Sequence, residues 1–264
     1  MEFWLLYLAV GVFAGFLAGL LGVGGGLVIV PALAFIFAAE HFPAAHIMHL
    51  ALGTSLASIL FTSVSSLRAH HAHGAVNWAV VRGISPGIVV GTLLGTLVVA
   101  QLSTFFLKTF FIVFVYYVAT QMLLNIKPKP SRQLPGMAGL FAAGSVIGGV
   151  SSLVGIGGGT LSVPFMTWCN VKLHQAIGTS AAIGFPIAAA GALGFLLNGL
   201  LAQDLPPYSW GFVYLPALAG LVAASVVTAP LGAKMAHRLP VAMLKKIFAA
   251  LLIVLGTRML SSLI

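Results

Sequence analysis

Charged side chains are scarce in this sequence. Of its 264 residues, 6% are charged and 60% are hydrophobic. A soluble domain carries about 25% charged residues, because its surface has to be solvated. So little polar surface excludes a soluble globular protein. Because the apolar segments are continuous and do not alternate with polar residues, they predict membrane-spanning helices rather than a β-barrel.

Acidic residues and cysteine are rarer still. Three Asp and Glu residues stand against 12 Lys and Arg, a formal charge of +9, and Cys169 is the single cysteine. Basic residues mark the cytoplasmic loops of helical membrane proteins, so this excess predicts no nucleic-acid partner, although it also favours an anionic substrate. A lone cysteine excludes an internal disulfide and a multi-cysteine metal site. We therefore predict a multi-pass protein of the lipid bilayer with no metal and no cofactor.

The apolar segments fall into two sets of five. The first set covers 3–21, 27–39, 45–67, 78–100 and 104–125, and the second covers 137–154, 160–170, 174–198, 210–233 and 241–263. We interpret 1–125 and 137–264 as two transmembrane repeats, joined by a linker, 126–136, that is rich in proline and charge. A helical span takes about 20 residues. The second segment of each set is shorter, which predicts a half-helix or one arm of a re-entrant hairpin.

The two sets are copies of one another. Gly22 matches Gly155, and each is followed nine residues later by a proline, Pro31 or Pro164. The motif "HLALGTS" that begins at His49 matches "HQAIGTS" that begins at His174. Internal duplication in a helical membrane protein is typical of a secondary transporter. The sequence therefore predicts an all-α polytopic fold built from two repeats of about five helical segments each.

The loop charges predict that the repeats have opposite topology. The loop after the third segment carries Arg68 and Arg82 in the first repeat, whereas its copy carries Asp204. The loop after the fourth segment reverses this, with one lysine in the first repeat and four basic residues in the second. Since basic loops are cytoplasmic, we expect inverted repeats with both termini outside and the linker in the cytoplasm.

Two glycine-rich stretches interrupt the apolar segments at matching positions, "GLLGVGGGLVIVP" (19–31) and "SLVGIGGGTLSVP" (152–164). Glycine permits left-handed backbone and close approach, so each stretch predicts a helix break at membrane depth. Unpaired amides at the start of the following helix, together with its dipole, would bind an anion. The alternative is that the glycines serve close helix packing. The candidate substrate-binding residues of the breaks are Gly22, Gly24, Gly25, Gly26, Leu27, Gly155, Gly157, Gly158, Gly159 and Thr160.

Both glycine stretches and the paired "GTS" motifs resemble those of the sulfite exporter TauE/SafE family, and the similarity covers both repeats. The resemblance implies a multi-span secondary transporter of the bacterial inner membrane that moves small sulfur-containing anions, such as sulfite or organosulfonates. The glycines of the two breaks match the family's glycine-rich motif. Thr54, Ser55, Thr179 and Ser180 match its GTS motif.

The hydroxyls of the GTS motifs are candidate substrate donors, because they bind sulfonate oxygens without a buried charge. The alternative is that they bond carbonyls of their own helix. His49 and His174 are candidate proton-coupling residues or simply interfacial side chains. No Asp or Glu lies within a predicted span, which excludes coupling through a buried carboxylate. The "RAHHAHG" cluster lacks acidic or thiol partners, so it does not predict a metal site.

The sequence thus predicts a secondary transporter that exports a small sulfur-containing anion by alternating access. An anion channel, or an uptake carrier for a related oxyanion, is the alternative. We do not expect an enzyme, because the predicted spans contain no paired carboxylates, no Ser/His/Asp set and no cluster of metal ligands. The expected partners are the small anion, the lipid bilayer and a coupling ion, either a proton or sodium. The sequence leaves the particular anion and the oligomeric state open.

Overall fold

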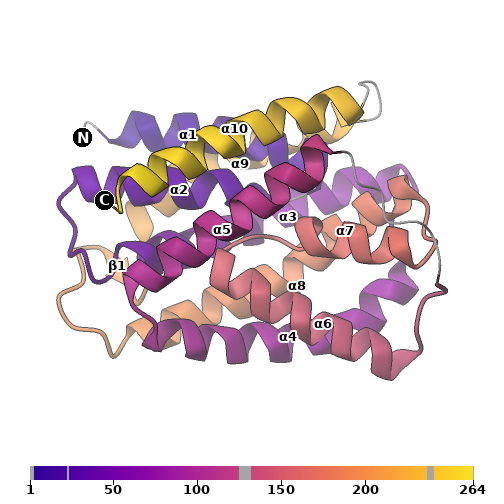
Figure 1. Cartoon of the computed structure of the whole chain (residues 1–264), viewed down its shortest axis with the longest axis horizontal. Helices are drawn as coiled ribbons and strands as arrows, with labels where there is room; N and C mark the ends of the chain where they lie inside the picture. The colour runs from indigo at the N-terminus through magenta and orange to yellow at the C-terminus, as the bar shows by residue number, and fades with distance from the viewer. Residues whose placement is uncertain (1–2, 23, 125–131, 237–240, 264) are drawn as a thin grey trace.

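Ten helices and one short β-hairpin form the described part of the chain. The computed structural model describes residues 3–22, 24–124, 132–236 and 241–263. The elements are α1 (Trp4–Leu21), α2 (Gly26–Ala39), α3 (Ile47–Ala72), α4 (Trp78–Gln101), α5 (Thr104–Leu123), α6 (Met137–Val154), α7 (Gly159–Trp168), α8 (Leu173–Gly199), β1 (Ser209–Trp210), β2 (Val213–Tyr214), α9 (Leu215–Ala236) and α10 (Val241–Ser261) (Figure 1). Among the described residues, six helices are long and apolar enough to cross a membrane, namely α3, α4, α5, α6, α8 and α9.

Glycine, asparagine and serine set the ends of these helices. α1 and α6 both stop at a left-handed glycine, Gly22 (φ 66°) and Gly155 (φ 67°), a conformation that a residue with a Cβ rarely adopts. The side chain of Asn77 accepts hydrogen bonds from two amides at the start of α4, and Ser103 does the same for Phe106 in α5. These signals explain why the predicted helices are confirmed within a few residues at most ends.

Two predicted boundaries are wrong. The third segment continues beyond residue 67 to Ala72, so His70 and His71 lie in the last turn of α3 and not in a loop. The segment predicted from 210 begins at Leu215, because residues 209–214 form the hairpin of β1 and β2. The turn of that hairpin contains Gly211, whose φ of 53° favours glycine.

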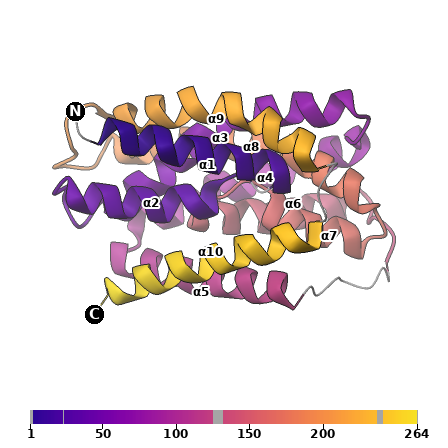
Figure 2. The same ribbon diagram turned by 90° about the horizontal axis from the view of Figure 1, so that it is seen from above.

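The short second helix of each repeat folds back along its first helix. In Figure 2, α1 enters from the side that carries both chain termini, and α2 returns to that side. α6 and α7 form the matching hairpin from the opposite side. We call the side at Trp4 and Ser261 the terminal end, and the side at Leu123 and Met137 the linker end. The linker residues 126–131 themselves lie outside the described residues.

The first helix of each repeat packs against the fourth helix of the other repeat. The two most extensive contacts are those of α1 with α9 and of α6 with α4, which correspond to each other in the duplication. In each contact, one helix presents glycines spaced four residues apart. Because glycine has no side chain, the backbones of the two helices can touch there. The glycines are Gly11, Gly15 and Gly19 of α1, and Gly87, Gly91 and Gly95 of α4.

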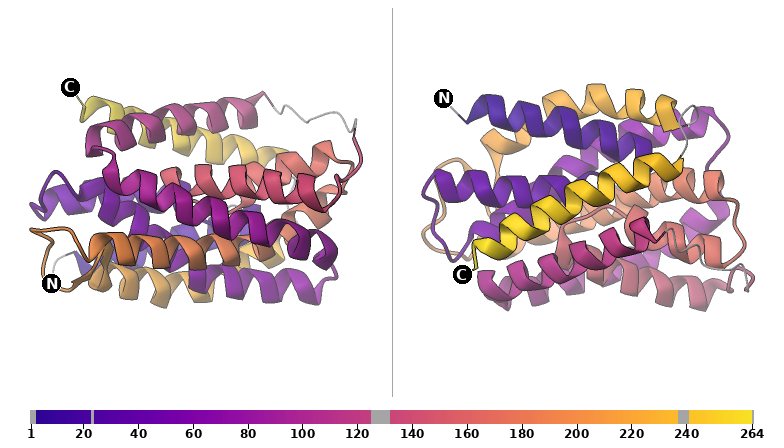
Figure 3. Two further views of the ribbon diagram at one scale, coloured as in Figure 1. Left: turned by 90° about the horizontal axis from the view of Figure 1, so that it is seen from below. Right: turned by 45° about the horizontal axis from the view of Figure 1, so that its top comes forward.

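α3 and α8, which also correspond, pack against each other and are the most deeply buried of the six candidate spans. α5 and α10 pair along one outer side of the molecule, as the two views of Figure 3 show. These opposed hairpins and matched contacts are compatible with the inverted repeats that the loop charges predict.

Candidate substrate site

The two glycine-rich breaks meet in the interior of the molecule. A Cβ on Gly24 would lie 2.9 Å from the Cα of Gly157, and a Cβ on Gly26 would overlap the carbonyl oxygen of Gly155. Gly24 also has a φ of 81°. Backbone from one repeat therefore contacts backbone from the other, at an approach that only glycine permits.

A small pocket lies beside this meeting point. It is lined by glycine, small apolar residues and hydroxyls, with no charged side chain among its lining residues. These are Ala18, Gly22, Gly24, Ile59, Thr62, Ser63, Ser66, Gly157, Gly158, Ser180, Ala181 and Gly184. Both breaks thus contribute to one uncharged pocket, whose wall includes four hydroxyl residues.

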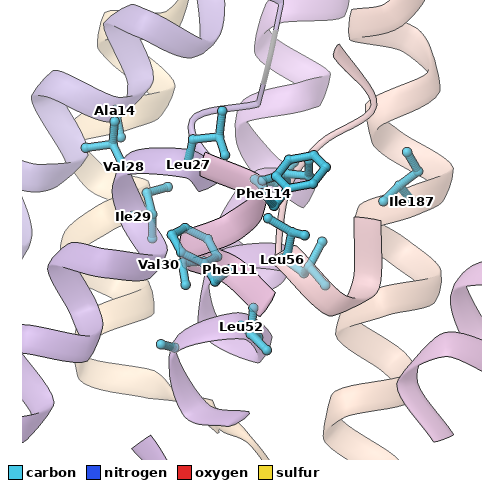
Figure 4. Close-up of a cluster of buried hydrophobic side chains, with 14 of the residues drawn as sticks. Ala14, Leu27, Val28, Ile29, Val30, Leu52, Leu56, Phe111, Phe114 and Ile187 are labelled. Carbon is cyan, nitrogen blue, oxygen red and sulfur yellow. The ribbon is translucent and has the colours of Figure 1, made fainter. Parts of the chain in front are cut away.

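The pocket lies on the linker side of the meeting point. Ile59 of α3 is next to Gly24, and α3 continues past the pocket to its end at Ala72 on the linker end. The terminal side is filled by buried apolar side chains, among them Leu27, Leu56 and Ile187 (Figure 4). This pocket therefore lies to one side of the breaks, toward the linker end.

The serines of the GTS motifs tie each break to the other repeat. Ser55 in α3 donates a hydrogen bond to the carbonyl of Gly155 (2.8 Å), and Ser180 in α8 donates one to the carbonyl of Gly22 (3.2 Å). Both side chains are fully buried. A carbonyl left free by the end of α1 or α6 is thus satisfied by a serine that belongs to the opposite repeat.

The threonines of the same motifs hold the starts of the fourth helices. Thr54 accepts a hydrogen bond from the amide of Tyr214, just before α9, and Thr179 accepts one from the amide of Asn77, just before α4; both measure 2.9 Å. Gly53, which precedes Thr54, likewise contacts the other repeat, because it lies against the backbone of Phe212. Every residue of the motif therefore has an inter-repeat contact, a role that sequence reasoning missed because the partner groups are distant in the chain.

The predicted site residues separate into two groups. Five of them line the pocket, which are Gly22, Gly24, Gly157, Gly158 and Ser180. The others surround it within the interior, which are Gly25, Gly26, Leu27, Thr54, Ser55, Gly155, Gly159, Thr160 and Thr179. Of the second group, Thr160 is 6% exposed and its hydroxyl has no hydrogen-bond partner in the described structure.

Three hydroxyl residues of the pocket were not predicted. Thr62, Ser63 and Ser66 lie on the second half of α3, and none exposes more than 5% of its surface. Together with Ser58 they recur at helical spacing in "SILFTSVSS", a signal that one face of this helix is polar within the membrane. The signal is absent from the matching part of the second repeat, so a search for shared motifs does not find it.

The two matched histidines have different surroundings. His49 is 4% exposed, its Nε2 lies 3.1 Å from the carbonyl of Val99, and its ring packs on Phe212. His174 is exposed. Neither lines the pocket. Arg258 is also exposed, in the last turn of α10.

The two carboxylates in the described part of the chain, Glu40 and Asp204, do not line the pocket. Glu40, at the end of α2, accepts a hydrogen bond from the hydroxyl of Tyr7 (2.9 Å), and burial raises the pKa of its carboxyl. Asp204 is exposed between α8 and β1. In the described ranges, no three His, Cys, Asp or Glu side chains gather as metal ligands would.

In the described part of the chain, six helices long and apolar enough to cross a membrane, together with a pocket beside two broken helices, define a multi-pass membrane transporter. It belongs to the sulfite exporter TauE/SafE family, whose family model matches residues 7–259. It is 40% identical over 259 residues to a "Probable membrane transporter protein" of Haemophilus influenzae, covering 97% of this chain and 98% of that one. It is 26% identical over 262 residues to a probable membrane transporter protein of Methanocaldococcus jannaschii, covering 97% and 94%. No solved structure matches the chain.

Proposed function

We propose that the chain is a secondary transporter that exports a small sulfur-containing anion, sulfite or an organosulfonate, across the bacterial inner membrane. The observation that carries this proposal is the pocket where the two glycine-rich breaks meet, lined by hydroxyls and backbone without a charged side chain. The substrate class rests on the family to which the chain belongs. The geometry supplies the means of holding an anion.

The start of α2 supplies positive charge to the pocket. α2 begins at Gly26 and runs from the breaks to the terminal end, so its first amides point toward the linker side, where Gly22 and Gly24 just before it line the pocket. The first amides of a helix have no acceptor within it, and the helix dipole places about half an elementary charge at this end. An anion held by such partial charges and by hydroxyls is not trapped by a full ion pair, which suits a carrier that has to release it.

The position of the pocket on the linker side of the breaks supports alternating access. Apolar packing closes the terminal side, and the space lies toward the linker end. Arg68, Arg82, Lys172 and Lys234 lie near the linker end, so we place that end in the cytoplasm. In this orientation the pocket lies on the cytoplasmic side of the breaks, which supports an exporter that takes up its substrate from the cytoplasm. His49 remains the candidate proton carrier, because it is buried in the helix that also lines the pocket.

Counterflow in proteoliposomes tests the proposal. Vesicles preloaded with unlabelled sulfite or sulfoacetate should accumulate the labelled anion transiently above its external concentration. A carrier returns loaded with either species, whereas a channel gives no such overshoot. Protein-free vesicles are the control. An anion conductance without counterflow would favour the channel, and pumping toward the linker side would favour an uptake carrier.

Cysteine labelling in whole cells tests the orientation. In a variant without Cys169, cysteines at His71 and Lys234 should be shielded from an impermeant thiol reagent, and a cysteine at Asp204 should react. The first two are exposed at the linker end and the third is exposed at the terminal end. Arg238, near Lys234, lies outside the described residues. Labelling of Lys234→Cys from outside would contradict the inverted topology.

A further inference from the structure

We infer that the face of α3 formed by Thr62, Ser63 and Ser66 is the part of the pocket that binds the sulfur–oxygen group of the substrate. The inference rests on the proposed function and assigns the binding contacts to residues outside the two motifs shared by the repeats. The observations that support it concern hydrogen bonding, the asymmetry of the two repeats, and charge.

Ser66 lines the pocket and has a hydroxyl without a hydrogen-bond partner in the described structure. Its side chain is 4% exposed. Leaving a buried hydroxyl unpaired costs about 1–3 kcal/mol, so such a group in a pocket is a candidate donor for a ligand. An oxyanion oxygen would satisfy it.

Thr62 and Ser63 flank this hydroxyl on the same helix. Thr62 donates to the carbonyl of Ser58 (3.0 Å), and Ser63 donates to that of Leu60 (3.0 Å). These carbonyls already belong to the helix ladder, so the hydroxyls can turn toward a better acceptor by rotation about χ1. By contrast, the hydroxyls of Ser55 and Ser180 hold the carbonyls of the breaks, and turning them would leave those carbonyls unpaired.

The hydroxyl face occurs in one repeat only. At the three matching positions α8 carries Ile187, Ala188 and Gly191. Conversely, Leu56 of α3 occupies the position that Ala181 has in α8, and its side chain packs against Gly191. Thus the two repeats use the same backbone frame, but only the linker side combines small residues with hydroxyls. A structural requirement of the fold would apply to both repeats, whereas a binding surface needs to be built once.

The charge around this face fits an anion and not a cation. None of the pocket-lining residues is acidic, and the first amides of α2 point toward the linker side, beside Gly22 and Gly24 of the pocket. A sodium ion would require several oxygens with negative partial charge directed inward, but the carbonyls of Gly22 and Gly155 are engaged by serines. A ligand with acceptor oxygens is the complement of free hydroxyls and helix amides.

Thiol modification of purified protein tests this assignment without transport. In the Cys169→Ala background, Ser66→Cys and Ser63→Cys should react faster with 2-sulfonatoethyl methanethiosulfonate than with its trimethylammonium analogue. We expect the anion-to-cation rate ratio to exceed that of the exposed control Tyr208→Cys by about tenfold, which corresponds to 1.4 kcal/mol. Sulfoacetate should slow the reaction. Ser225→Cys, which replaces a buried and equally unpartnered hydroxyl outside the pocket, should react with neither reagent.

Hydroxyl removal is the second arm. Ser66→Ala and Thr62→Val should each weaken sulfoacetate binding to purified protein by about tenfold or more, the usual loss for a hydrogen bond to a charged group. Ser225→Ala and Arg258→Gln should bind as the wild type does. Wild-type binding by Ser66→Ala together with a rate ratio at Ser66→Cys equal to that at Tyr208→Cys would overturn the assignment. Absence of counterflow for every sulfur anion, with the rate preference intact, would instead overturn the proposed substrate and leave the anion site standing.

Discussion

Replacing Gly26 with alanine should unfold or severely destabilise the protein. A Cβ at this position would overlap the carbonyl oxygen of Gly155 and lie 2.8 Å from the Cα of Ile156, both of them backbone atoms that cannot rotate away. The alanine would push the two breaks apart and stretch the hydrogen bond from Ser55 to Gly155. Overpacking costs about 1–3 kcal/mol, and a lost bond to a buried carbonyl adds about 1–3 kcal/mol.

The measurement is thermal unfolding of purified protein, together with the yield of monodisperse protein from membranes. A matched control is Gly184→Ala, another buried glycine of the interior, whose added Cβ would meet nothing closer than a side-chain atom at 3.6 Å. We expect Gly26→Ala to melt at least about 5 °C below Gly184→Ala. Equal melting temperatures would mean that the breaks do not touch as described.

The sequence contains most of the information that sets this fold. Continuous apolar runs place the helices, and left-handed glycines at Gly22 and Gly155 place the breaks, because both signals are local. The hairpin at 209–214 escaped prediction because its residues are mostly apolar and continue the hydrophobic run before α9. A turn of this kind is stabilised by contact with α8 and not by its own composition.

The candidate site was harder to predict because its contacts are not local. The sequence marks Ser55 and Ser180 as matched hydroxyls, but their acceptors are carbonyls 100 and 158 residues away. A comparison of the two repeats finds the residues that they share. The hydroxyl face of α3 occurs in one repeat only, so such a comparison does not find it. Shared residues build the frame in this molecule, and unshared residues shape the pocket within it.

Filling the pocket should stop transport without harming the fold. Ala181 lines the pocket and corresponds to Leu56, whose side chain fills the equivalent space on the terminal side. The change Ala181→Leu would therefore place a leucine side chain in the pocket, as Leu56 already does in the equivalent space of the other repeat. Because Ala181 is one of the small residues that line the pocket, the longer leucine side chain would occupy this space and exclude an anion from the wall opposite α3. We expect the initial rate of sulfite or sulfoacetate counterflow to fall by at least about tenfold, the equivalent of 1.4 kcal/mol in binding.

The reciprocal change, Leu56→Ala, separates this steric effect from instability. It opens a cavity in the apolar packing of the terminal side, which costs about 2–5 kcal/mol, so its melting temperature should fall and its transport should decline with the folded fraction. Ala181→Leu should melt at or above the wild-type temperature, because it buries apolar surface in existing space. If folded Ala181→Leu carried sulfite at the wild-type rate, the anion would have to cross elsewhere, and the pocket at the two breaks would not be its path.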